Sequence, residues 1–446
     1  MRVLFASVTR TRLIALVGAT QLAMIGALLR VAGWLGVIQL ANYVLAVVTL
    51  LVVTRAFGPS IFGTLATISA LAAYVGLVVT FGLNLSGPRL VVRLRDSPDE
   101  LSNALSTVAC MQVLLGTMAA AGFMLVVSIV SPGSEYTLIS AFIVLQACLT
   151  AITPDWAFLG LERMRDFAIL QVVGRVLTTV CTVMFIHTSS DVLLYVEINA
   201  FAAAGIAVAS IGVLRTKGIY WRAPKLEAIW QTIHDAAANF LSTASINLYT
   251  STGVVIVNFI LGPAAAGPFA LADRLRNVVG NVTLPIITAI YPFVCRIAAT
   301  PEAAEDEAWT KRIFFQGTLG LSAALSLGLF VFAPTIISLA GGAAFAEAVP
   351  ILRILAAVPF LIALSNILGI QTMMPLGMDW HAMWIFATTA AIGVIGMFVS
   401  TDLFGLRGSA FSVLAIEVFV TITMIVVLQR RIDVLSLFIN LQTWKE

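Results

Sequence analysis

The chain has 446 residues, of which 60% are hydrophobic and only 11% are charged, and its mean hydropathy is +1.03. Because soluble domains carry about 25% charged residues, this composition excludes a soluble protein and indicates a polytopic membrane protein. The net charge of +3 gives no reason to expect a nucleic-acid partner. The four cysteines show neither metal-ligand nor CxxC spacing, so we expect no bound metal and no cofactor.

Long apolar segments predict an all-α membrane protein with about 12 transmembrane helices in all. A helix that crosses the hydrocarbon core needs about 20 apolar residues. The predicted spans are residues 32–54, 61–86, 105–130, 137–160, 168–187, 192–213, 236–262, 268–295, 313–338, 349–371, 381–400 and 408–428.

The positions of Lys and Arg predict the orientation of these spans, because cytoplasmic loops carry an excess of both. Of the 25 basic residues, nineteen fall on one side of the predicted topology, and only Arg55 and Arg407 fall on the other. This asymmetry places both termini in the cytoplasm. The remaining basic residues lie within predicted helices: Arg175, Arg274, Arg276 and Arg353.

The terminal segments lie outside the predicted bundle. Residues 1–31 form an N-terminal segment in which residues 13–29 are apolar enough for either an in-plane helix or an extra span. Spanning would move three arginines to the outer side, which favours the in-plane helix. Residues 429–446 are expected to form a cytoplasmic amphipathic tail.

An internal repeat predicts two lobes. The sequence GPSIFGTLA begins at Gly58, and GPAAAGPFA begins at Gly262, 204 residues later, each at the end of a predicted helix. Either the match arises by chance in a chain rich in Gly and Ala, or it marks two six-helix lobes related by an axis along the membrane normal. On the second interpretation the N-lobe is residues 32–213, the linker 214–235 and the C-lobe 236–428.

The span at residues 236–262 carries a polar face. Its members recur at steps of four and seven and therefore share one side of a helix: Asn239, Thr243, Asn247, Ser251 and Asn258. Lipid does not tolerate such a face, so it is expected to line a solvated path or to hold helices together.

Other predicted helices repeat this pattern and add positive charge. One face carries Gln39, Asn42 and Thr49, another carries Arg274, Asn277 and Asn281, and a third carries Arg175. Sugar hydroxyls need amide and hydroxyl partners, and phosphate needs a cation, preferably the forked guanidinium of Arg. We therefore expect phosphate contacts at Arg274, Arg276 and Arg175 and sugar contacts along the polar faces, although Arg274 could instead pair with Asp273.

Glu417 lies near the middle of its predicted span, where a carboxylate is costly. It could couple transport to a proton or sodium gradient, or it could be the structural partner of an Arg across the cavity.

Four motifs in order along the chain resemble a known family. They are Arg55-Ala-Phe-Gly58-Pro-Ser-Ile-Phe62-Gly63, Phe81-Gly82-Leu83 followed by Arg89, the stretch from Pro154 through Trp156, Phe158 and Gly160 to Glu162, and the turn from Gly262 to Arg274 with the later Tyr291-Pro292. Together they resemble the polysaccharide-transporter (Wzx-type) oligosaccharide flippases of the multidrug/oligosaccharidyl-lipid/polysaccharide exporter superfamily. Thr80 departs from the family pattern, which often has an acidic residue there, so no ion-coupling role is carried over to it.

The resemblance implies two six-helix bundles in a V-shaped, MATE-like arrangement around a central cavity. It also implies export of an undecaprenyl-diphosphate-linked glycan across the bacterial inner membrane, in contact with membrane lipid and with a polysaccharide polymerase or other assembly proteins as partners. Two alternatives stay open: a cation or drug antiporter, which would need a carboxylate-rich cavity, and an integral-membrane polysaccharide enzyme, which would need larger loops. The sequence identifies neither the glycan, the coupling ion nor the oligomeric state.

Overall fold

A computed structural model describes residues 42–130, 136–299, 301–432 and 434–438, and these residues form helices and no β-strand. The predicted all-α fold is therefore confirmed. The first helix of the described residues is Asn42–Thr80. It is followed by α2 (Leu83–Leu94), α3 (Pro98–Val130), α4 (Tyr136–Ile152), α5 (Asp155–Gly160), α6 (Met164–Phe185), η1 (Ser189–Asp191), α7 (Val192–Arg215), α8 (Leu226–Leu261), α9 (Pro263–Gly280), η2 (Asn281–Thr283), α10 (Leu284–Ala299), α11 (Pro301–Val331), α12 (Ala333–Gly341), η3 (Ala343–Phe345), α13 (Ala348–Leu355), α14 (Val358–Leu368), the π-helix η4 (Gly369–Met373), α15 (Asp379–Gln429) and η5 (Val434–Leu437).

Eight helices in the described part of the chain are long and apolar enough to cross a membrane. Two of them are too long for a single crossing. The Asn42–Thr80 helix has 39 residues, and Gly58 inside it has a φ of 67°. At 1.5 Å per residue a straight helix of this length would extend about 58 Å, nearly twice the ~30 Å hydrocarbon core.

The other long element, α15, turns back on itself at Gly405, whose φ of 60° and ψ of −147° are not helical. The hydroxyls of Thr401 and Ser409 lie 2.9 Å apart across this turn, whereas residues eight apart in a straight helix would be about 12 Å apart. Glycine is required twice here. Gly405 adopts a positive φ, and a Cβ on Gly408 would overlap the carbonyl oxygen of Ser400.

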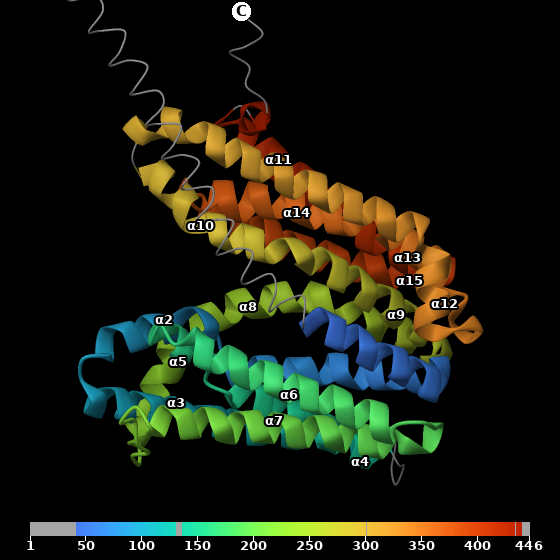
Figure 1. Ribbon diagram of the computed structural model, residues 1–446, viewed down its shortest axis with the longest axis horizontal. Helices are drawn as coiled ribbons and strands as arrows, with labels where there is room; N and C mark the ends of the chain where they lie inside the picture. The colour runs from blue at the N-terminus through green and yellow to red at the C-terminus, as the bar shows by residue number, and fades with distance from the viewer. Residues whose placement is uncertain (1–41, 131–135, 300, 433, 439–446) are drawn as a thin grey trace, which may run out of the picture.

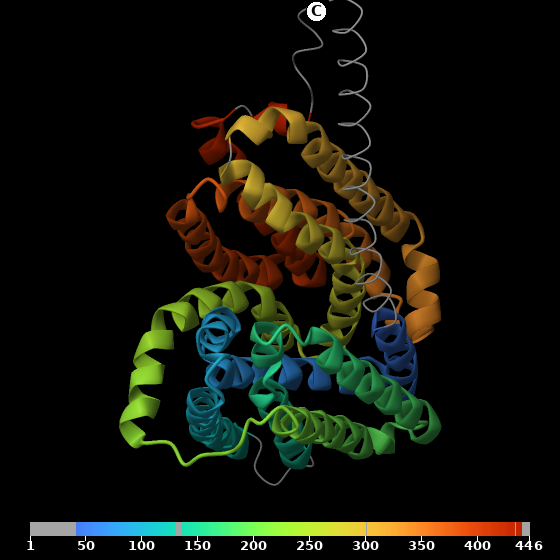
Figure 2. The same cartoon turned by 60° about the vertical axis from the view of Figure 1, so that its left-hand side comes forward.

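The helices gather into two groups in Figure 1. The Asn42–Thr80 helix packs with α2–α7, and α9–α15 form the second group, with α8 running between the two (Figure 1). The groups meet at the end that holds α9 and α12 and diverge toward the end that holds α2 and α10, a divergence also visible in the turned view of Figure 2. Within the groups, α7 packs on α4 and α6, while α15 packs on α13 and α14.

The two copies of the internal repeat pack against each other where the groups meet. A Cβ on Gly63 would overlap the carbonyl oxygen of Pro263, and a Cβ on Gly267 would overlap the carbonyl oxygen of Pro59. Since Pro263 and Gly267 lie 204 residues after Pro59 and Gly63, the contact is reciprocal. We call this contact, made by residues 58–63 and 262–267, the Gly-Pro seam.

Further contacts join the groups beside the Gly-Pro seam. The hydroxyl of Thr54 donates to the carbonyl oxygen of Ala340 at 2.6 Å, and the guanidinium of Arg55 donates to the carbonyl oxygen of Leu339 at 2.7 Å. The rings of Phe62 and Phe345 meet edge to face at 5.8 Å. The largest buried apolar cluster includes both rings, so this end of the molecule is closed.

Candidate functional site

Two cavities lie along the line between the helix groups. The main cavity has a volume of about 720 Å³ and is lined by the Asn42–Thr80 helix, the first residues of α2 and α5, and by α4, α6, α7 and one face of α9. The second cavity, of about 440 Å³, is lined chiefly by α8, α9 and α15. Ser69, Arg274 and Asn277 line both, so these residues form the boundary between the two cavities.

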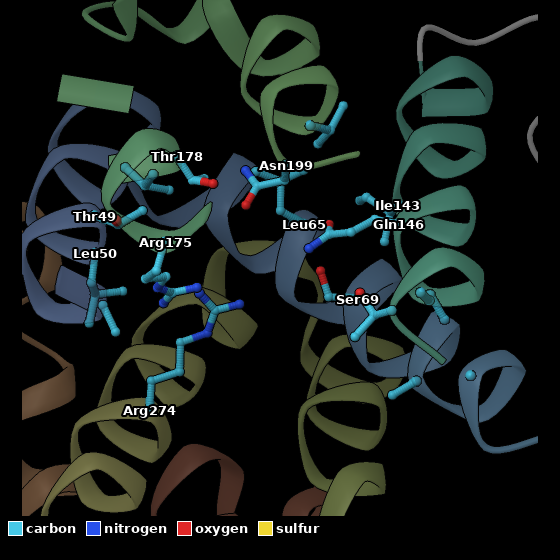
Figure 3. A pocket seen from close by; sticks show the side chains of 18 of the residues that line it. Thr49, Leu50, Leu65, Ser69, Ile143, Gln146, Arg175, Thr178, Asn199 and Arg274 are labelled. Atoms are coloured by element: carbon cyan, nitrogen blue, oxygen red, sulfur yellow. The ribbon is translucent and has the colours of Figure 1, made fainter. Parts of the chain in front are cut away.

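Two arginines converge in the main cavity from different helix groups. Arg175 projects from α6 and Arg274 from α9, and Figure 3 shows their guanidinium groups directed toward each other. The Arg274 guanidinium lies 5.2 Å from the centre of the Phe62 ring, a cation–π contact that holds it in place. No described carboxylate forms a salt bridge with either arginine. Two like charges that face each other without a counter-ion are suited to binding an anion.

The rest of the main cavity mixes apolar side chains with uncharged hydroxyl and amide groups. Its hydroxyl and amide groups come from Thr49, Ser69, Thr80, Asn84, Gln146, Thr150, Thr178, Tyr195, Asn199 and Asn277, several of which appear in Figure 3. Asp155 is the one acidic residue among the described lining residues. Such a wall can exchange hydrogen bonds with a polyhydroxylated ligand.

The second cavity holds an ion-paired cluster. The guanidinium of Arg276 donates to a carboxylate oxygen of Asp273 at 2.7 Å, and the Arg276 side chain is 9% exposed. The amide of Asn277 donates to the other oxygen of Asp273 at 3.0 Å. Glu417 on α15 lines the same cavity, close enough to interact electrostatically with Arg276. The salt-bridge partner of Asp273 is therefore Arg276 and not Arg274, as the sequence had left open. Arg274 points into the main cavity.

The remaining predicted sugar contacts lie elsewhere or outside the described part. Asn42, Asn239 and Asn281 are not among the described residues that line either cavity. Asn239 packs against Gly82, and its carbonyl oxygen accepts a hydrogen bond of 2.9 Å from Thr243. Gln39 and the side chains of Asn247 and Ser251 lie outside the described residues.

Several polar cavity residues were not anticipated from the sequence. Asn84, Gln146, Thr150 and Asn199 contribute amides and a hydroxyl to the main cavity. Gln146 and Thr150 are four residues apart on α4, which is a helical spacing, but two residues alone make a weak signal. Asn199 follows Tyr195 by four residues on α7, and Asn84 follows Thr80 by four residues across the start of α2, so these are again pairs too short to make a periodic signal.

Comparison with known proteins shows which family this chain belongs to. Residues 28–298, more than half of the chain, match the family described as polysaccharide biosynthesis protein. The chain belongs to this family. A protein of Escherichia coli (strain K12) named "Putative O-antigen transporter" is 27% identical over 394 residues, which cover 88% of this chain and 94% of that protein. A protein of the same name from Shigella dysenteriae is 24% identical and covers 86% of this chain and 96% of its own length.

Solved structures agree with the fold of this family member. The lipid II flippase MurJ in an inward closed conformation has a TM-score of 0.67 at 12% identity, covering 90% of this chain and 88% of MurJ. An inward-facing multidrug resistance MATE family transporter of the MOP superfamily has a TM-score of 0.64 at 14% identity, covering 88% and 96%. At such identities the likeness shows the fold alone. The named relatives are transporters, which confirms the expectation of a transporter rather than an enzyme and the resemblance found in the sequence.

Proposed function

We infer that this protein is a flippase that moves an undecaprenyl-diphosphate-linked oligosaccharide across the bacterial inner membrane. Its product would serve the synthesis of O-antigen, capsule or exopolysaccharide. The observation that carries this proposal is the pair of arginines, Arg175 and Arg274, which share one cavity with a set of uncharged hydroxyl and amide groups and form no salt bridge with a described carboxylate. The names of the related transporters support the substrate class.

The proposed topology has 12 spans in two six-helix lobes, with both termini in the cytoplasm. The bend at Gly58 and the reversal at Gly405 support two crossings each for the helices that contain them. The basic loops then face the cytoplasm together with the end of the molecule where the helix groups diverge. The Gly-Pro seam lies at the outer end, so this conformation faces inward.

In the proposed mechanism the diphosphate bridges the lobes. Arg175 belongs to the first lobe and Arg274 to the second, so a bound dianion reduces the repulsion between the two guanidiniums and draws the lobes together. The sugars occupy the polar cavity, and the prenyl chain stays in lipid. Rocking of the lobes then has to break the Gly-Pro seam and release the glycan outside.

A MATE-like antiporter is the alternative that the fold likeness favours. An organic cation would meet two arginines and a single carboxylate among the described residues of the main cavity, which disfavours its binding. The carboxylates of Glu417 and Asp273 in the second cavity fit a role in coupling transport to a proton or sodium gradient, whether the protein is a flippase or an antiporter.

Replacing the arginines tests the proposal. In a strain that depends on this protein for its surface polysaccharide, Arg274→Ala and Arg175→Ala should abolish export and leave lipid-linked glycan at the inner leaflet. Arg407→Ala is the matched control, because Arg407 is exposed and lines neither cavity. Each variant must be present in the membrane at the wild-type level. Wild-type export from Arg274→Ala would exclude the proposed role of its charge.

A further inference from the structure

The basic and acidic side chains of the main cavity lie at different depths. Arg175 lies about 16 Å along α6 from its first residue, Met164, at 1.5 Å per residue. Asp155 is the first residue of α5, the short helix that leads to the start of α6, and its side chain lines the same cavity. The positive charge is therefore deep in the cavity, whereas the carboxylate lies toward the end where the helix groups diverge.

The Asp155 side chain is fixed by a backbone hydrogen bond and forms no salt bridge with a described residue. One of its oxygens accepts the backbone N–H of Trp156 at 2.8 Å, which fixes the side chain. No described Lys or Arg forms a salt bridge with it, and the residue is exposed to the cavity. A ligand that reaches this point meets an acidic side chain that no described cation pairs with.

Free amides and a hydroxyl line the cavity between the two charged regions. Gln146 and Thr150 project from α4, and Asn84 projects from α2. The side-chain amides of Gln146 and Asn84 form no hydrogen bond with any described residue, so both can donate to and accept from a ligand.

We propose that this stretch of the cavity, from Gln146 to Asp155, is the glycan subsite and that Asp155 selects neutral or amine-bearing sugars over sugars that carry a carboxylate. The inference rests on the proposed function, because a diphosphate between Arg175 and Arg274 fixes where the glycan begins. The Gly-Pro seam closes the opposite direction, so the sugars extend toward Asp155. A uronic acid there would place two carboxylates in one cavity, and like charges repel more strongly away from bulk water.

Binding measurements with three probes test the subsite. The full-length protein, purified in lipid nanodiscs, is titrated with prenyl-diphosphate disaccharides whose second sugar is a neutral hexose, a hexosamine or glucuronic acid. We expect the wild type to bind the first two with similar affinity and the glucuronic acid probe about ten-fold more weakly. Asp155→Asn, which keeps the size of the side chain and an oxygen for the Trp156 N–H, should largely remove this difference. Gln146→Ala should weaken all three probes without changing their order.

The matched control is Asp402→Asn, which removes an exposed carboxylate of α15 outside both cavities and should leave all three affinities unchanged. If the wild type binds the glucuronic acid probe as tightly as the neutral one, the assignment of Asp155 is wrong while the diphosphate site stands. If no probe binds the wild type, or if Arg274→Ala leaves every affinity unchanged, the proposed function itself fails.

Discussion

Substituting Gly63 by Ala should open the Gly-Pro seam. The added Cβ would meet the carbonyl oxygen of Pro263 and the amide nitrogen of Gly267. Both are backbone atoms, so no side-chain rotation can relieve the overlap and the two helix groups must separate. Overpacking of this kind costs about 1–3 kcal/mol. The gain in helix propensity from Gly to Ala is present in both conformations and cancels from their equilibrium.

A cost of about 2 kcal/mol corresponds to a roughly 30-fold shift toward the conformation in which the seam is open. A cysteine at Ala66 reports this shift, because Ala66 is only 6% exposed and lies one helical turn beyond Gly63. In a background without the native cysteines, a membrane-impermeant maleimide added to intact cells should label this cysteine about 10- to 30-fold faster in the Gly63→Ala variant. Gly267→Ala should have the same effect, since the contact is reciprocal.

Gly205→Ala provides the control, because a Cβ at Gly205 on α7 would have nothing within 4 Å. Both variants gain the same methyl group, and only one of them gains it at the contact between the groups. Equal labelling rates for Gly63→Ala and Gly205→Ala, at equal protein levels in the membrane, would refute the steric reasoning.

Three further outcomes are expected. Asp273→Asn removes the salt-bridge partner of the buried Arg276 guanidinium while Glu417 stays nearby, and should cost about 1.5–3 kcal/mol, seen as a lower melting temperature in detergent. An unchanged melting temperature would show that the pair is not needed. Gly408→Ala places a Cβ on the carbonyl oxygen of Ser400 and should lower the melting temperature through the α15 turn; a rise would contradict the close packing seen there. Arg274→Lys keeps the charge but loses the planar fork, so polysaccharide export should fall between that of the wild type and that of the alanine variant; full export would show that charge alone suffices.

The sequence predicts the helical fold well because the signals are local. Span length and apolar composition are properties of each segment, and the Gly-Pro motif is visible as a repeat. Contact between the two copies could not be predicted, since it depends on how the helix groups pack. The reversal at Gly405, by contrast, falls in the loop predicted between the spans at residues 381–400 and 408–428.

The lining of the main cavity could be predicted where neighbouring residues share a helix face. Arg274 and Asn277 are three residues apart and both reach the main cavity. Arg276 lies two residues from Arg274, about 200° around the helix, and lines the second cavity but not the main one. Polar residues outside a longer periodic pattern, such as Asn84 and Asn199, are recognised as cavity residues only when packing brings their helices together, which periodicity along a single helix does not reveal.

The reciprocity of the Gly-Pro seam has a consequence for how such a chain could arise. In the Gly-Pro seam each copy of the motif places its glycine against the proline carbonyl of the other copy. Two identical subunits related by a two-fold axis make the same kind of contact, which is called isologous. The seam is thus a dimer interface contained within one polypeptide, and duplication with fusion of an ancestral half would preserve it. Because the interface requires no covalent link, the two halves produced as separate chains have a surface through which to reassociate.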